Sequence, residues 1–148
     1  MSEPGTDPES VVRAFLGDLE RLDVDAATDR LAADAVYQNV PFPAARGRKA
    51  IAKQLAGLAR YGSGFEVRYH NVAVNGSTVL TERNDVLVFG PVRADFWVCG
   101  TFEVVDGHIT LWRDRFDFVD FTVAFLRGAV KALVGAVTGG RSSSAGAS

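Results

Sequence analysis

The chain has 148 residues, of which 47% are apolar, 10% are aromatic and 23% are charged, and its formal net charge is -2. This length and composition are typical of one globular domain with a substantial core, and they exclude a disordered or fibrous chain. A net charge this close to zero gives no electrostatic attraction to a phosphate backbone, so we expect no nucleic-acid partner.

The cysteine content and the N-terminal residues indicate the cellular compartment in which the protein is expected. Cys99 is the only cysteine, so no disulfide can form within one chain, as is usual in a reducing compartment. Residues 1–8, which we expect to be flexible, lack the basic start and the apolar stretch of a secretory signal. The sequence therefore predicts a cytoplasmic location.

Helices are predicted throughout the first part of the chain. Apolar residues recur at helical spacing over residues 8–22, about 25–33 and 47–61. We expect Leu31 to be the main apolar anchor of the second helix, and Gly62 to end the third. Between these two helices, residues 34–40 form a short extended segment that is stopped by Pro41 and Pro43.

From residue 65 the apolar period changes to two residues, which is the period of a strand. It predicts strands over residues 65–73, 78–89, 94–105 and 108–118. Asn75-Gly76 and Asp106-Gly107 favour tight hairpin turns between them, so these strands form an antiparallel meander. Helices followed by strands, without alternation, predict an α+β domain in which helices cover one side of a curved sheet and a cavity lies between them.

The last part of the chain is again strongly apolar, from Phe121 to Val134, which predicts a final helix. Its unbroken apolar runs are shorter than a bilayer requires, and Arg127 and Lys131 interrupt them, so we expect no transmembrane segment. Two interpretations of this helix stay open, namely packing or a dimer contact, and association with a membrane surface. The expected domain limits are residues 9–138, followed by a disordered tail over 139–148.

Two aspartates, Asp85 and Asp114, lie on strand faces that are otherwise largely apolar, and Arg83 shares the face of Asp85. Carboxylates are rarely buried unless they are paired. If both faces line the core, the two carboxyl groups look into the same space with the arginine available to bridge them. This arrangement suits an acid/base pair, and a buried salt-bridge network that sets the strand register is the alternative.

Tyr37 and Asn39 are two residues apart and share a face if their segment is extended. A phenol and an amide together can orient the lone pair of a water molecule while a carboxylate removes its proton. The alternative interpretation is that these two side chains only complete the hydrogen bonding at the end of the strand before Pro41.

Taken in order, these motifs resemble the limonene-1,2-epoxide hydrolase family. The resemblance covers roughly residues 10–121 and is carried by Tyr37-Gln38-Asn39 with the proline-containing loop after it, by Arg83-Asn84-Asp85, and by residues 107–114. It implies an α+β fold of the nuclear-transport-factor-2-like kind: a cone-shaped, curved, mixed or antiparallel sheet with N-terminal helices packed on it, enclosing a deep apolar pocket. It also implies a homodimer and a mechanism with no metal, no cofactor and no covalent intermediate.

The resemblance further implies a role for each polar residue. Asp114 would be the general base that takes a proton from a water held by Tyr37 and Asn39. Asp85 would be the general acid that protonates the epoxide oxygen, and Arg83 would bridge the two carboxyl groups. The family's pocket positions fall on Leu19, Leu58, Phe96, Val98 and Phe121. Because all five are apolar, the expected substrate is a terpene-like, sterol-like or lipid epoxide, which water converts to a vicinal diol.

Two residues depart from the family pattern, Asn84 and Arg115, and both are expected to face away from the pocket. Two other functions stay open: a ketosteroid-isomerase-like or polyketide-cyclase-like enzyme of the same fold, and a non-catalytic carrier of apolar ligands. An arginine shared by two acids argues against the isomerase. His70 and His108 lack metal-ligand spacing and Cys99 has no neighbouring histidine in sequence, so we expect no zinc site and no cysteine nucleophile.

Overall fold

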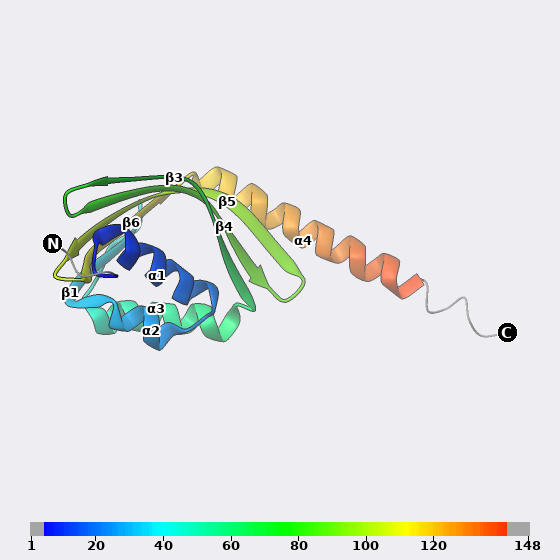
Figure 1. Ribbon diagram of the computed structural model, residues 1–148. Coiled ribbons are helices and arrows are strands. Elements are labelled where there is room, and N and C mark those ends of the chain that lie inside the picture. Colours follow the sequence, from blue (N-terminus) through cyan, green and yellow to red (C-terminus); the bar gives the residue numbers. More distant parts are fainter. Residues whose placement is uncertain (1–4, 142–148) are drawn as a thin grey trace.

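A curved six-stranded sheet with three helices on its inner side forms the body of the chain, and a fourth helix runs outward from it (Figure 1). The computed structural model describes residues 5–141. The helices are α1 (Pro8–Glu20), α2 (Val24–Asp29), α3 (Arg48–Tyr61) and α4 (Phe118–Arg141). The strands are β1 (Leu31–Val40), β2 (Ala45–Arg46), β3 (Gly64–Asn75), β4 (Thr78–Phe89), β5 (Val92–Val105) and β6 (His108–Phe116).

The strand order is β2-β1-β6-β5-β4-β3, and strands β3 to β6 pair antiparallel with their chain neighbours. The α+β class and the predicted meander are therefore confirmed. Strand β1 pairs with β6 in parallel, which makes the sheet mixed. Both predicted hairpin turns also form. Gly76, Asp106 and Gly107 have the positive φ angles that tight hairpin turns require, with values of 60°, 51° and 78°.

The predicted second helix was wrong at its C-terminal end. Helix α2 ends at Asp29, and Leu31 is not its anchor but the first residue of β1, where it is fully buried and pairs with Ile109. At Leu31, pairing with a strand that is distant in sequence outweighs the local helical pattern. Similarly, the predicted last strand is two residues too long, because the carboxylate of Asp117 accepts hydrogen bonds from the backbone of Val119 and Asp120 and α4 begins at Phe118.

The core lies between the concave face of the sheet and helices α1 to α3. Asp7 caps α1 by accepting from the backbone of Ser10 at 3.1 Å, and the helix buries one apolar face against the sheet. Phe15 on that face meets Trp112 of β6 edge to face, with ring centroids 4.9 Å apart. The side of α1 that faces the sheet therefore forms one wall of the space between the helices and the sheet.

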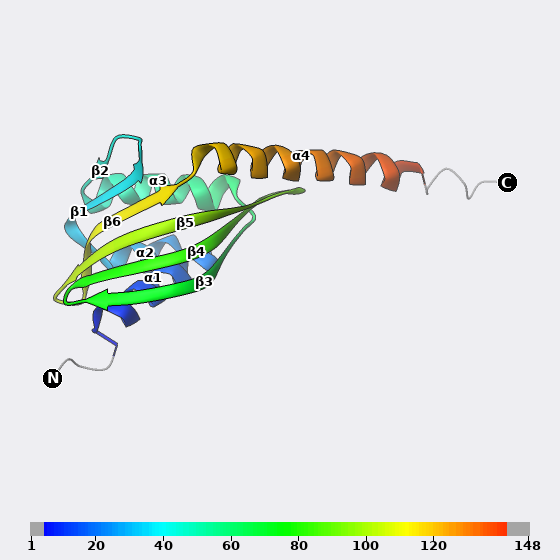
Figure 2. The same ribbon diagram turned by 90° about the horizontal axis from the view of Figure 1, so that it is seen from above.

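Helix α4 is longer than the predicted segment, with 24 residues, and it packs along β5 (Figure 2). By length and composition alone it could cross a membrane, because an 18-residue window within Phe118–Gly139 has a mean hydropathy of 1.5 and only 6% of that window is buried. The expectation that this segment is too short was wrong, since one helix continues through Arg127 and Lys131. The absence of a transmembrane segment stays a prediction.

Most of the expected flexible ends lie outside the described residues. Within residues 5–141, helix α1 already begins at Pro8 and helix α4 continues through Arg141.

Candidate active site

The polar residues predicted on β4 and β6 point into the interior. Thr81, Arg83 and Asp85 share the inner face of β4 and are 2%, 0% and 4% exposed, and Asp114 of β6 is 5% exposed. Strand β5 lies between β4 and β6, and its Gly100 pairs with Thr81 on one side and with Asp114 on the other. A glycine at this position leaves the space that the guanidinium group occupies.

The guanidinium group of Arg83 joins the two aspartates. Its Nε donates to Oδ1 of Asp85 at 2.8 Å, and its Nη2 donates both to Oδ2 of Asp85 at 3.1 Å and to Oδ2 of Asp114 at 2.9 Å. Its Nη1 donates to Oγ1 of Thr81 at 2.8 Å. A planar fork with all three nitrogens bonded holds the two carboxyl groups in a fixed relation.

These buried charges shift one another's pKa values. Burial raises the pKa of Asp85 to about 6, although Arg83 works in the opposite direction. Burial also opposes the charge on Arg83, but Asp114 and Asp85 outweigh it, so the pKa of the arginine is raised and the guanidinium stays protonated. The site therefore holds a permanent cation beside a carboxyl group that binds a proton more readily than a surface aspartate.

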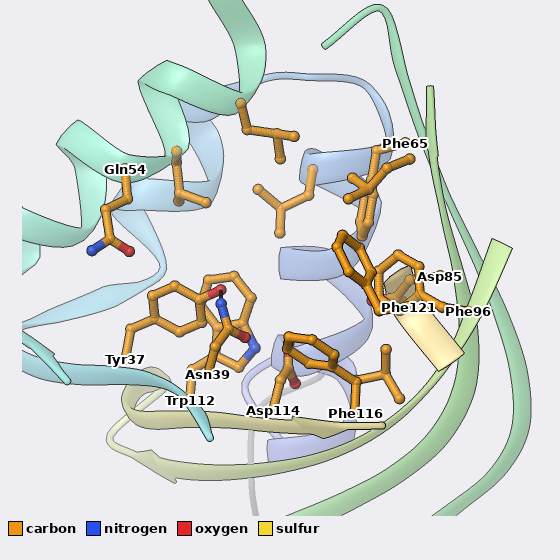
Figure 3. Close-up of a pocket in the computed structure, with 15 residues that line it drawn as sticks. Tyr37, Asn39, Gln54, Phe65, Asp85, Phe96, Trp112, Asp114, Phe116 and Phe121 are labelled. Carbon is orange, nitrogen blue, oxygen red and sulfur yellow. Dashed lines mark hydrogen bonds between the residues drawn. The ribbon is translucent and has the colours of Figure 1, made fainter. Parts of the chain in front are cut away.

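Strand β1 brings Tyr37 and Asn39 to the same place. In the parallel pairing of β1 with β6, Tyr37 lies opposite Trp112 and Asn39 lies opposite Asp114. The Tyr37 ring stacks on Trp112 with centroids 3.8 Å apart, and Nδ2 of Asn39 donates to the phenol oxygen at 2.5 Å. Figure 3 shows Tyr37, Asn39 and Asp114 side by side. The two residues do more than satisfy a strand end, because they line the same cavity as the carboxylates.

One carboxylate oxygen in this group has no partner. Oδ1 of Asp114 is buried and makes no hydrogen bond within residues 5–141, whereas Oδ2 of the same group is bonded to Arg83. Burial is the main cause that raises the pKa of Tyr37, so its phenol keeps its proton at neutral pH and can donate it in a hydrogen bond. An acceptor at Asp114 and a donor at Tyr37 suit a small molecule with both capacities, such as water.

A cavity of about 280 Å³ lies in front of these residues, and Asp85 and Asp114 both line it. The five predicted pocket positions also line it, namely Leu19, Leu58, Phe96, Val98 and Phe121. The rings of Phe96, Phe116 and Phe121, from β5, β6 and α4, pack within 6.0 Å of one another at the centroids. The cavity is therefore apolar except at the carboxylates and their partners and at Gln54.

Several lining residues were not predicted as pocket positions: Gln54, Leu55, Phe65, Leu87, Trp112 and Phe116. For Phe65 and Leu87 the sequence carried a signal, because in each predicted strand the alternation of side chains puts the residue on a face with other apolar residues. Leu55 precedes Leu58 by one helical turn, which is also a readable signal. Gln54 had none, since an exposed polar residue on a helix is ordinary.

Asn84 and Arg115, the two departures from the family pattern, both face away from the cavity as expected. Asn84 points outward and bonds to His70 at 2.8 Å and to Asp95 at 2.7 Å, and Arg115 is exposed. Within residues 5–141, no three histidine, cysteine or acidic side chains are grouped so that they could hold a metal ion.

A curved mixed sheet with helices on its concave side defines the nuclear-transport-factor-2-like class, and in this domain one arginine bridges two buried aspartates beside an apolar cavity. Residues 6–127 match the family described as "Limonene-1,2-epoxide hydrolase catalytic domain". The chain belongs to that family. It is 47% identical over 123 residues to "Epoxide hydrolase EphG" of Mycobacterium tuberculosis (strain ATCC 25618 / H37Rv), a match that covers 83% of this chain and 82% of that protein.

Solved structures agree with this assignment. The "Structure of an M.tuberculosis LEH-like epoxide hydrolase" is 47% identical, with a TM-score of 0.78 over 84% of this chain and 92% of that one. An NTF2-like protein of unknown function from Cytophaga hutchinsonii is 16% identical, with a TM-score of 0.64 over 78% and 95% of the two chains. A ketosteroid-isomerase-like protein from Catenulispora acidiphila is also 16% identical, with a TM-score of 0.71 over 80% and 93%. These last two show the fold alone. The family match and the two 47% identical proteins show that the chain is an epoxide hydrolase.

Proposed function

We propose that this epoxide hydrolase adds water to an apolar epoxide in a single acid/base step that gives a vicinal diol. One observation carries the proposal: Asp85 and Asp114 both line an apolar cavity while both are bonded to the same arginine. Two carboxyl groups whose environments differ are the recurring arrangement for an acid and a base that act together.

Asp114 is the general base. Its Oδ2 is occupied by Arg83, which leaves Oδ1 to accept a proton from water. Tyr37 and Asn39 lie beside it and orient that water by hydrogen bonds. The water oxygen forms a bond to one epoxide carbon as its proton passes to Asp114.

Asp85 is the general acid. Its raised pKa, about 6, lets a fraction of the protein carry a proton there at neutral pH. As the bond between carbon and the epoxide oxygen breaks, that oxygen takes the proton from Asp85 and becomes the second hydroxyl group. The proton gained by Asp114 must then return to Asp85, which resets the site for the next turnover.

The substrate is a terpene-like, sterol-like or lipid epoxide. The cavity wall offers apolar and aromatic surface from α1, α3, α4, β3, β4, β5 and β6, with polar groups concentrated at the carboxylates and on Gln54. Such a wall binds hydrocarbon by removing it from water and leaves the epoxide oxygen as the group that hydrogen bonds can direct. The cytoplasmic location and the homodimer stay part of this proposal.

The test is diol formation from a panel of terpene, fatty-acid and sterol epoxides. Asp85→Asn and Asp114→Asn keep the size of each side chain and are expected to lose nearly all turnover on a substrate that the wild type accepts. Asp95→Asn is the matched control, since Asp95 is exposed on β5 and bonds outward to Asn84. Unchanged turnover in either folded active-site variant would contradict the assigned roles.

A further inference from the structure

Helix α4 has one face occupied by its own domain. Gly128 on that face is buried, and a Cβ atom there would collide with the backbone carbonyl of Arg93 on β5. Phe121, two turns earlier, lies on the same face and lines the cavity. Figures 1 and 2 show the rest of α4 continuing past the edge of the sheet. The opposite face therefore has no neighbour within the described chain.

That opposite face carries an apolar seam. Its residues follow one another at alternating steps of four and three: Val119, Val123, Leu126, Val130, Leu133 and Val137. Each is between 44% and 70% exposed. Steps of four and three make a heptad repeat, which places all six side chains in one line along the helix. Exposed apolar surface of this length on a soluble domain marks an interaction site.

The residue types within the seam indicate which partner it fits. Val123, Val130 and Val137 occupy one core position of the heptad, and the other is occupied by Leu126 and Leu133, preceded by Val119. A β-branched residue at the first position with leucine at the second favours two parallel helices that pack knobs into holes. A second α4 offers the same pattern, so the seam is complementary to itself.

The exposed area comes close to what such a pair requires. At roughly 100 Å² for a fully exposed Val or Leu side chain, the seams of two copies would cover about 700 Å². Val134 flanks the seam and is 55% exposed. With it the apolar side chains cover about 800 Å², and the polar residues beside the seam add area toward the lower limit of about 1,000 Å² for a specific interface.

A bilayer surface fits this face less well. Helices that lie in a membrane interface carry a polar face rich in Lys and Arg, and Trp, Phe or Leu on the apolar face. The seam itself consists of Val and Leu and has no aromatic residue, and residues 118–141 contain no Trp or Tyr. The polar positions of these residues carry Arg127, Lys131 and Arg141 together with the acid Asp120, so they are not uniformly basic.

We infer that two copies of this chain pair through the seams of their α4 helices, parallel and in register. Each domain packs on the outer side of its own α4, so the two domains lie on opposite sides of the helix pair and do not obstruct it. The pairing goes beyond the proposed catalytic function, because every residue of the acid/base site comes from one chain.

The first test compares masses by light scattering on the full chain at micromolar concentration. Val130→Glu with Leu133→Glu places two charges in the seam, outside the residues that line the cavity. Lys131→Glu with Thr138→Glu places the same residues on the polar face as a control. We expect the mass of the seam variant to be half that of the wild type and of the control, with helix content and diol formation per chain retained.

The second test fixes the orientation. In a Cys99→Ser background, Val130→Cys places identical thiols opposite one another only in a parallel pair that is in register, and Lys131→Cys is the control. We expect the first variant to form an intermolecular disulfide much faster than the second. Equal rates would contradict the parallel pairing.

Two results would overturn the inference altogether. One is a mass that the seam substitutions leave unchanged. The other is a monomeric wild type that co-sediments with vesicles of phosphatidylcholine and phosphatidylglycerol, and loses that binding in the seam variant, which would assign the face to a membrane. Neither result would alter diol formation, so failure here is distinguishable from failure of the proposed function.

Discussion

Gly100 lies directly opposite Asp114 in the antiparallel pairing of β5 and β6. A Cβ atom there would stand 2.9 Å from Oδ1 of Asp114 and 2.7 Å from Oγ1 of Thr81, and it would also collide with Nη1 of Arg83. Atoms in a folded interior do not approach so closely without displacement. The missing side chain at this position is therefore what allows the arginine to reach both carboxylates.

Gly100→Ala should disable the enzyme while leaving it folded. The added methyl group displaces Arg83 or Asp114, and a misplacement near 1 Å is expected to lower kcat/KM by about 100-fold. Overpacking of this kind costs roughly 1–3 kcal/mol of stability. The check is diol formation together with thermal unfolding. Gly57→Ala is the control, because a Cβ atom there meets nothing within 4 Å, and full activity in Gly100→Ala would show that the site tolerates displacement.

The pH dependence of kcat/KM should report the proton on Asp85. Only the protonated carboxyl group can donate to the epoxide oxygen, and its pKa is raised to about 6, mainly by burial. The protonated fraction is nearly complete well below that pH and falls tenfold per unit well above it. The rate should therefore decline on the alkaline side with a midpoint near 6. Carboxyl NMR of the wild type, compared with Asp85→Asn, assigns the titration, and a flat profile through this range would contradict the acid role.

Arg83→Lys should lose activity although the charge is kept. A lysine amine is a point donor that cannot reproduce the fork through which Arg83 reaches Thr81, Asp85 and Asp114 at once. Leaving buried carboxylates poorly paired costs roughly 3–5 kcal/mol, which denaturant unfolding would measure. Arg68→Lys is the matched control, because Arg68 is exposed and forms its ion pairs with two surface acids, Glu66 and Asp95. Normal kinetics in Arg83→Lys would contradict the claim that catalysis needs the Arg83 bridge between the two carboxyl groups.

Tyr37→Phe should lower kcat more than it changes KM. The ring would still stack on Trp112, so the cavity wall survives, but the hydroxyl group that helps to orient the water is lost. We expect kcat to fall by about 100-fold, the scale of effects on orientation. Steady-state kinetics against one accepted epoxide separates the two constants. Tyr61→Phe, at a residue that is 71% exposed, should behave as the wild type.

The inward faces of the strands were predictable from sequence because alternation is a local property of the chain. Arg83, Asp85 and Asp114 had to point to the same side as their apolar neighbours, and all three do. The roles assigned to them came from a family resemblance rather than from the period. Local pattern alone favoured a structural salt-bridge network over a catalytic pair.

Other features depend on pairings that no local pattern encodes. The parallel pairing of β1 with β6 brings Asn39 opposite Asp114, although the two are far apart in sequence. The same pairing explains why Leu31 lies in the sheet, although the local pattern predicted that it belongs to a helix. Gly100 looked like an ordinary strand glycine until β4 and β6 were placed on either side of it.

A single turnover in heavy-oxygen water tests the central claim most directly. With enzyme in excess over epoxide, direct attack by water held at Asp114 places the heavy oxygen in the diol formed in the first turnover. If a carboxylate attacked the epoxide instead, the added oxygen would come from the protein and the first diol would carry no label. Labelled diol is the predicted result, and unlabelled first-turnover diol would contradict the one-step acid/base mechanism.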